Sequence, residues 1–177
     1  MQALTLRYPR PEDAAAIHAA VVESRAELAP WMPWCHADYG RADTLMWIEA
    51  VAASRRNNTA HEFCIFDAGG HLLGSCGING IQLDYRLANL GYWVRSSATG
   101  EGVATSASRQ LVDWAFANTP VHRLEIIAAV GNLKSQRVAE KLGAEREGVL
   151  RHRLLTAEGF TDAVLYSIIN GQESSAA

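Results

Sequence analysis

Cysteine is scarce in this sequence, and the cysteines and histidines that it has follow no metal-binding pattern. Three cysteines occur among the 177 residues, Cys35, Cys64 and Cys76, and their spacing is not that of a metal-binding motif. An odd number of cysteines without such spacing indicates reduced thiols and argues against a disulfide framework. The six histidines are scattered, without a His-x-x-x-His pair on a predicted helix, so we expect no metal site.

Excess positive charge and long apolar runs are also missing. Sixteen Lys and Arg residues against nineteen Asp and Glu residues give a formal net charge of −3, which excludes a general attraction for nucleic acid or anionic lipid. The longest aliphatic run, residues 126–130, is far too short to cross a bilayer, and residues 1–10 lack the apolar stretch of a signal peptide. We therefore expect a cytoplasmic protein with no direct nucleic-acid partner and no membrane partner.

The composition is that of one ordinary globular domain. Hydrophobic residues make up 49% of the chain and charged residues 20%, and this length suffices for one domain with a sizeable core. The sequence has no internal repeat and no low-complexity tract. We predict a single domain over residues 1–170, followed by a tail over residues 171–177 that is expected to be disordered.

Hydrophobic periodicity predicts alternating strands and helices. The predicted strands cover residues 4–7, 61–66, 72–78, 88–95, 123–130, 144–155 and 161–169. The predicted helices cover residues 14–27, 44–56 (capped by Asp43), 101–118 and 133–142. The strands at 88–95 and 123–130 flank a helix, which makes them a parallel pair in a β–α–β unit.

A glycine-containing loop joins the first strand of that unit to its helix. Gly100 and Gly102 leave the backbone bare where the helix begins, so unpaired N–H groups can face an anion. A dinucleotide-binding fingerprint would need a third glycine where Thr105 stands, and no Gly-Lys-Ser/Thr of a P-loop follows. The loop is a candidate phosphate cradle; an ordinary tight connection between a strand and a helix is the alternative.

Two further features are candidates for a ligand site. Trp31 and Trp34 lie in a proline-containing loop, where they could form a ligand wall, pack onto the core or make a subunit contact. Ser135 shares a helical face with Val138 and Leu142, which should pack on the sheet. Its hydroxyl would then point inward, unless it bonds to its own helix backbone.

Several segments together closely resemble the GNAT superfamily of acetyl-CoA-dependent N-acetyltransferases. They are the strand Leu90–Val94, the loop Thr99–Thr105 and the motif Asn132-x-x-Ser135-x-x-Val138-x-Glu140-Lys141-Leu142-Gly143 running into residues 147–151. Within the superfamily they look like the RimJ/RimL type, which acetylates protein N-termini, ribosomal proteins among them. Residues 30–34 and 162–167 also fit that type, so the resemblance covers almost the whole chain.

The resemblance implies an α/β fold, an activity and a set of site residues. The fold would be a mixed, mostly antiparallel sheet of about seven strands, splayed at a central parallel pair and flanked by about four helices. Acetyl-CoA would be the co-substrate, without a metal. The residues implied in its binding are Trp93, Val94, Arg95 and Asn132 along the pantetheine, Thr99, Gly100, Glu101, Gly102, Val103, Ala104 and Thr105 around the pyrophosphate, and Ser135 near the sulfur. Ser135 would be the general acid that protonates the departing thiolate, and Asn132 is the other residue implied in catalysis.

The sequence departs from the resemblance at the general base. The carboxylate proposed as base in some Rim-type enzymes aligns with Leu154, and Asn89 stands where many relatives carry a glutamate. The glycine motif also has Ser97 where the superfamily prefers Gln or Arg. The base is therefore unassigned, with Glu62 and Asp84 as candidates.

The missing base bears on the acceptor. An α-amino group with a pKa of about 7.8 is roughly one-third neutral at pH 7.5, whereas a lysine with a pKa of about 10.4 is neutral about one time in a thousand. An enzyme without a strong base is thus better suited to an N-terminal amine of a protein or peptide. The alternatives are a small-molecule amine, such as an antibiotic, polyamine or amino-acid derivative, and a non-catalytic acyl-CoA-binding module. A homodimer is possible.

Overall fold

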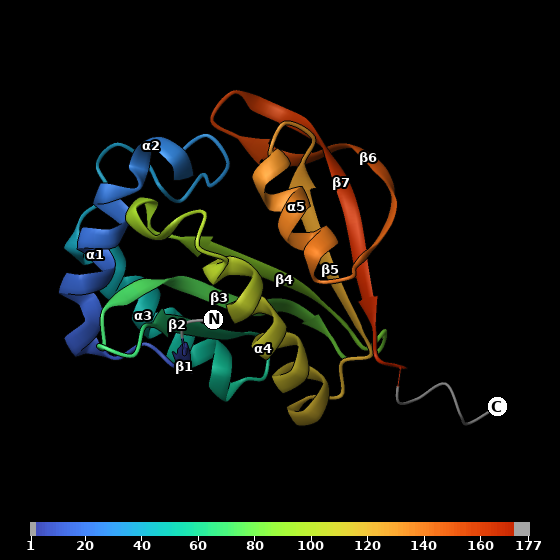
Figure 1. Cartoon of the computed structure of the whole chain (residues 1–177), viewed down its shortest axis with the longest axis horizontal. Coiled ribbons are helices and arrows are strands. Elements are labelled where there is room, and N and C mark those ends of the chain that lie inside the picture. The colour runs from blue at the N-terminus through green and yellow to red at the C-terminus, as the bar shows by residue number, and fades with distance from the viewer. Residues whose placement is uncertain (1–2, 172–177) are drawn as a thin grey trace.

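The computed structural model describes residues 3–171 of the chain as one seven-stranded sheet with helices on both faces (Figure 1). The strands are β1 (Thr5–Arg7), β2 (His61–Phe66), β3 (Leu72–Gln82), β4 (Leu87–Val94), β5 (Arg123–Ala129), β6 (Glu145–Thr156) and β7 (Gly159–Ile169). The α-helices are α1 (Ala14–Glu23), α2 (Arg25–Leu28), α3 (Arg41–Arg56), α4 (Val103–Asn118) and α5 (Leu133–Lys141), with short 3-10 helices η1 (Pro11–Asp13) and η2 (Ser96–Ala98). The predicted fold class is confirmed.

The strand order is β1-β2-β3-β4-β5-β7-β6, and every neighbouring pair is antiparallel except β4 and β5. The parallel pairing of β4 with β5 is short: it begins at Leu87 opposite Arg123 and ends at Asn89 opposite Glu125. Beyond Asn89, β4 continues to Val94 without a strand beside it on that side. The sheet is therefore splayed at the predicted parallel pair.

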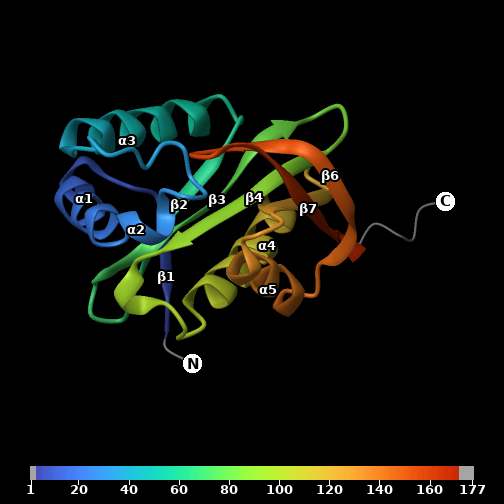
Figure 2. The same ribbon diagram turned by 90° about the horizontal axis from the view of Figure 1, so that it is seen from above.

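Two apolar clusters lie on opposite faces of this sheet. In Figure 2, helices α1, α2 and α3 cover one face, and α4 and α5 cover the other. The predicted stripe of α4 faces the sheet, because its members are all buried in one cluster: Val103, Ala107, Leu111 and Ala115. The second cluster includes Ile17 and Val21 of α1 and Ile48 of α3. Each face thus has its own core, as the amphipathic patterns require.

The prediction of one continuous helix over residues 14–27 is wrong. The helix divides at Ser24 into α1 and α2, because the Ser24 hydroxyl donates to the Ala20 carbonyl at 2.7 Å and competes with the helical backbone pattern. Residues 3–171 therefore contain five α-helices rather than about four. The division matters for the site, since Ser24 also contacts the segment that follows β4.

Two other predicted helix starts are also wrong. Asp43 is not the cap of α3 but its third residue, and its carboxylate accepts from the N–H of Gly40 at 2.8 Å. Helix α4 begins at Val103 rather than residue 101, because Gly102 has a left-handed backbone (φ 80°) that cannot belong to the helix. Residues 172–177 of the predicted tail lie outside the described residues.

No helix in residues 3–171 combines the length and the apolar character needed to cross a membrane. Over the same residues, no three or more His, Cys, Asp or Glu side chains form a group that could hold a metal ion. The three cysteines are buried as free thiols.

Candidate active site

The gap between β4 and β5 exposes backbone groups of β4. The Arg95 N–H donates to the carbonyl of Leu73 on β3 at 2.8 Å. Along an antiparallel strand, the backbone groups of successive residues point alternately toward one neighbouring strand and toward the other. The backbone groups of Leu90, Tyr92 and Val94 therefore face away from β3, toward the gap. They are free to pair with an extended ligand lying there, as an added strand would.

The loop between η2 and α4 presents a row of amides. In the described part of the chain, the first backbone hydrogen bond of this helix end runs from Ser106 N to Gly102 O at 2.9 Å, and no backbone bond uses the N–H groups of residues 100–105. Gly100 and Gly102 both have positive φ, and a Cβ on either would meet no atom within 4 Å. Open space in front of unpaired amides at a helix start fits a diphosphate.

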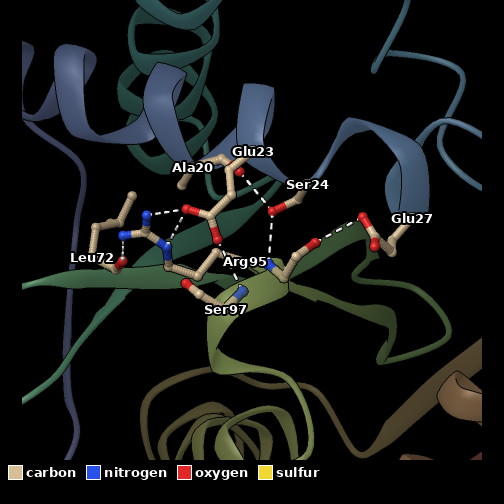
Figure 3. Close-up of polar contacts among 8 residues, drawn as sticks. Ala20, Glu23, Ser24, Glu27, Leu72, Arg95 and Ser97 are labelled. Carbon is tan, nitrogen blue, oxygen red and sulfur yellow. Dashed lines mark hydrogen bonds and ion pairs between the residues drawn. The ribbon is translucent and has the colours of Figure 1, made fainter.

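A polar network ties the entrance of this loop to α1 and α2 (Figure 3). The Arg95 guanidinium donates to the Glu23 carboxylate, whose other oxygen accepts from Ser97 N at 2.9 Å. Ser96 N donates to the Ser24 hydroxyl at 2.9 Å. The bonds from Arg95 and then Ser97 lower the pKa of Glu23 to about 2. The chain therefore leaves β4 in a fixed direction toward the glycine loop.

Ser135 lies at the other side of the gap, on the first turn of α5. The Asn132 side chain caps this helix, accepting from Ser135 N at 3.1 Å. The Tyr92 hydroxyl donates to Ser135 O at 2.9 Å and lies 3.0 Å from Ser135 Oγ. Burial raises the pKa of Tyr92 to about 12, so its hydroxyl stays protonated at neutral pH. Ser135 thus points toward the sheet, as its place on the helical face predicted.

A cavity of about 490 Å³ opens on the face of the sheet that does not carry α5. It lies between α1, α3, the loop before α3 and strands β2 to β4. Aromatic and sulfur-containing side chains form much of its wall: Met32, Trp34, Tyr39, Met46, Trp47, Tyr92 and Trp93. The rings of Trp34 and Trp93 make a tilted contact, with centroids 6.2 Å apart and planes at 55°. Trp31 is not among the described residues that line it; its ring lies against Gly131 instead, where a Cβ would be 3.3 Å from Trp31 Cη2.

The family model of the acetyltransferase (GNAT) domain matches residues 3–145 of the chain. This protein belongs to the GNAT acetyltransferase family. It is an acetyl-CoA-dependent N-acetyltransferase.

Similar proteins cover almost the whole of this GNAT chain. YdaF of Bacillus subtilis strain 168, to which a ribosomal N-acetyltransferase function is provisionally assigned, is 30% identical over 170 residues, or 94% of this chain and 91% of YdaF. The solved structure of Mycobacterium smegmatis RimJ in complex with a CoA disulfide is 27% identical, with a TM-score of 0.88, and the match covers 98% of this chain and 85% of that chain. The microcin C7 self-immunity acetyltransferase MccE, solved in complex with acetyl-CoA and AMP, has the same fold, with 24% identity, a TM-score of 0.88 and coverage of 94% and 92%.

The residues present in this GNAT chain fit acetyl-CoA, although the three residues predicted on β4 differ in whether their backbone groups face the gap. Val94 turns its backbone to the gap, whereas the N–H groups of Trp93 and Arg95 face β3. The Trp93 side chain lines the cavity, and the Arg95 side chain bonds Glu23. The unpaired amides of the glycine loop would hold the diphosphate, and the β4 gap would hold the pantetheine arm.

Glu62 of this acetyltransferase lies at the cavity floor, whereas Asp84 is exposed in the turn between β3 and β4. Asn79 Nδ2 donates to Glu62 Oε1 at 3.1 Å, and Asn89 Nδ2 donates to Asn79 Oδ1 at 3.1 Å. Burial raises the pKa of Glu62 to about 7, against a smaller lowering by the bond from Asn79. Of the two carboxylates left open by the sequence, only Glu62 faces the cavity.

Sequence reasoning missed Tyr92 and Asn79 as site residues. The Tyr92 side chain packs against the core under α4, and the residue also borders the cavity at the point where the sheet splays. Its place in an alternating apolar strand indicated only a core residue. Asn79 gave one weak signal, a polar side chain at the end of an apolar run.

Proposed function

We propose that this enzyme acetylates the N-terminal α-amine of a protein or peptide that enters the aromatic cavity. The observation that carries the proposal is the position of Tyr92 and Trp93: these neighbours line the cavity on a strand whose backbone borders the β4–β5 gap. A donor in the gap and an acceptor in the cavity would meet at this point of the strand. Holding two reactants together in this way accounts for a large part of a transfer reaction's acceleration.

The predicted site residues that border the gap take roles in this arrangement. When bound, acetyl-CoA supplies a thioester carbonyl that a neutral amine can attack. The Val94 N–H faces the gap and would polarise that carbonyl. The free amides of residues 100–105 would hold the diphosphate, with the Thr99 N–H already donated to Ser96 O, and Asn132 would contact the pantetheine while it caps α5. Ser135, in contact with the Tyr92 hydroxyl, would give a proton to the thiolate as the C–S bond breaks.

Two observations favour a protein or peptide N-terminus as the acceptor. The similarity to YdaF, to which a ribosomal N-acetyltransferase function is provisionally assigned, extends over 94% of this chain and favours a protein acceptor. The cavity is partly open to solvent, which leaves a path for the chain that follows an N-terminal residue. The first side chain of the acceptor would then lie among Met32, Trp34 and Trp47, so apolar N-terminal residues should be preferred.

A small-molecule amine is the second candidate. The cavity volume is within the range of small-ligand sites, and the microcin C7 self-immunity acetyltransferase MccE, which is similar in fold, was solved with the small molecule AMP bound. A small amine with an apolar body would fit the same aromatic wall. It would differ from a peptide in having nothing to extend out of the cavity.

Release of free CoA thiol from acetyl-CoA at pH 7.5 distinguishes the candidates. The acceptors are short peptides of one sequence with a free or a blocked N-terminus, the same peptides with different first residues, and a set of small amines. The proposal expects turnover that requires the free N-terminus. Turnover with small amines only would establish the second candidate, and acetyl-CoA binding without turnover of any amine would leave an acyl-CoA-binding module.

A further inference from the structure

We propose that Glu62 is the general base of this acetyltransferase, taking the proton from the acceptor ammonium across a trough formed by two glycines. This inference rests on the proposed function, because it assigns a role toward the amine in the same cavity. It concerns a residue on β2, two strands away from the strand that borders the acetyl-CoA gap.

The geometry of one row across the sheet carries the argument. Glu62 is opposite Gly77 of β3, and Gly77 is opposite Gly91 of β4. A Cβ at Gly77 would overlap Glu62 Oε2, so the carboxylate extends over β3 in the space that this glycine leaves. Because neighbouring strands are about 4.8 Å apart, the carboxylate then lies about one strand spacing from β4. That distance allows contact with an amine directly or through one water.

Gly91 keeps the path from Glu62 to β4 open. It is followed on the same strand by Tyr92 and Trp93, which border the cavity. A Cβ at Gly91 would make ordinary contacts, at 3.8 Å to Asn89 Nδ2 and 3.9 Å to Asn79 Nδ2. The protein therefore has room for a side chain here, and its absence leaves space for a ligand instead.

The hydrogen bonds of Glu62 fix one oxygen and leave the other free. Asn79 donates to Oε1 and is itself oriented by the donor amide of Asn89, which holds its oxygen away from the carboxylate. Among the described residues, no hydrogen bond uses Glu62 Oε2. The free oxygen is the one that lies over Gly77, facing the trough.

The surroundings of Glu62 keep it able to accept a proton near neutral pH. The other titratable groups that line the cavity are His36 and Tyr39 of the loop, Asp43 of α3 and Tyr92 of β4, and no Lys or Arg is among its described lining residues. Burial raises the thiol pKa values of Cys64 on β2 and Cys76 on β3, and the nearby charge of Glu62 adds to this rise. With no cation nearby, burial sets the pKa of Glu62 at about 7.

The proton balance favours an α-amine. One proton passes from the ammonium to Glu62, the neutral amine forms the C–N bond as the C–S bond breaks, and the second proton lost by nitrogen balances the one gained by the thiolate. Transfer from an α-ammonium of pKa about 7.8 to a group of pKa about 7 is uphill by about 6-fold, against about 2,500-fold for a lysine of pKa about 10.4.

The test is Glu62→Gln, assayed with whichever amine the wild type acetylates. We expect kcat/KM to fall by about 100-fold or more. In the wild type, activity should decline below pH 7 as Glu62 becomes protonated, and the variant should lack this decline. Acetyl-CoA affinity, measured by calorimetry, should stay within about 3-fold because the gap is untouched. The matched control Asp84→Asn removes the other candidate carboxylate and should leave both properties unchanged.

A second variant tests the trough without touching the carboxylate. Gly91→Ala should fold normally and raise the KM for the amine by about 10-fold or more, while acetyl-CoA affinity is kept. Wild-type rates and an unchanged pH profile in Glu62→Gln would overturn the inference. If only small amines are turned over, the proposed acceptor is wrong but Glu62 is still tested with that amine. If no amine is turned over, the base and the function fall together.

Discussion

The hydroxyl of Tyr92 donates to the Ser135 carbonyl at 2.9 Å and lies 3.0 Å from Ser135 Oγ. This contact joins β4 to the first turn of α5 across the splayed part of the sheet. Tyr92 also borders the aromatic cavity at its place on β4, so one residue of this strand adjoins both the acceptor site and the residue proposed to protonate the thiolate. The two sites are thereby held in a fixed relation.

Replacing Ser135 should separate acetyl-CoA binding from turnover. We expect Ser135→Ala to lower kcat by about 100-fold, since a positioned general acid contributes about that much, and Tyr92→Phe to lower it less. Acetyl-CoA affinity should change little in both. Steady-state kinetics and calorimetry measure the two effects, and Ser54→Ala on α3, on the other face of the sheet, is the control. Undiminished kcat in Ser135→Ala would remove Ser135 from the mechanism.

The glycine loop allows a matched comparison of two glycines with the same backbone. Gly102 and Gly143 both have φ 80° and open space at the Cβ position. Alanine at either should cost about 1 kcal/mol of unfolding free energy. Only Gly102→Ala should also weaken acetyl-CoA binding, by about 10-fold, because it alters the proposed diphosphate cradle. Equal acetyl-CoA affinities in the two variants would exclude the cradle.

Glu23 should matter for the order of the same loop. Glu23→Ala removes the partner of Arg95 and Ser97, so acetyl-CoA affinity should fall several-fold and stability by about 1 kcal/mol, a modest value because the pair is partly exposed to solvent. Exposed Glu49→Ala on α3 serves as the control.

The stability effect of Glu23 has a defined pH dependence. Its pKa is lowered from 4.5 to about 2 in the folded protein, so its contribution is complete above pH 4.5 and is lost as the pH falls through 2. Urea unfolding at pH 7 and pH 3 should show a smaller difference between wild type and Glu23→Ala at the lower pH. An equal difference at both would mean that the ion pair is not the cause.

Glu62 should have the opposite effect on stability. Its pKa is raised from 4.5 to about 7, so the folded state holds the proton more tightly and stability falls as the pH rises through this window. The full shift corresponds to about 3 kcal/mol, and partial contact with solvent reduces it. Glu62→Gln should therefore be about 1–2 kcal/mol more stable than wild type at pH 8 and no more stable at pH 4. A gain of equal size at both pH values would contradict a raised pKa.

Local patterns predicted the elements because each depends on neighbours in sequence. The strand at 61–66 was located to the residue, and the α4 stripe is buried as its spacing required. The division of the first helix was missed because it depends on one hydroxyl, that of Ser24, bonding back to the turn before it. Hydrophobic periodicity does not show which serine will bond to its own helix backbone and interrupt the helix.

The site was predictable only where a single segment forms it. The glycine loop and the Ser135 helix are each continuous in sequence, and their features could be read directly. The cavity floor depends on the register that places Glu62, Gly77 and Gly91 in one row, and that register is set by three strands together. For the same reason the pKa of Glu62 could not be anticipated, since its surroundings are formed by α1, α3 and strands β3 and β4 together.

Locating the acetyl group in the product tests the central claim most directly. A peptide with a free N-terminus and an internal lysine is incubated with the enzyme and acetyl-CoA at pH 7.5, and fragment masses assign the modified nitrogen. Acetylation of the α-amine alone, absent when the N-terminus is blocked, is the predicted result. Acetylation of the lysine, or no peptide product while small amines are acetylated, would contradict the account.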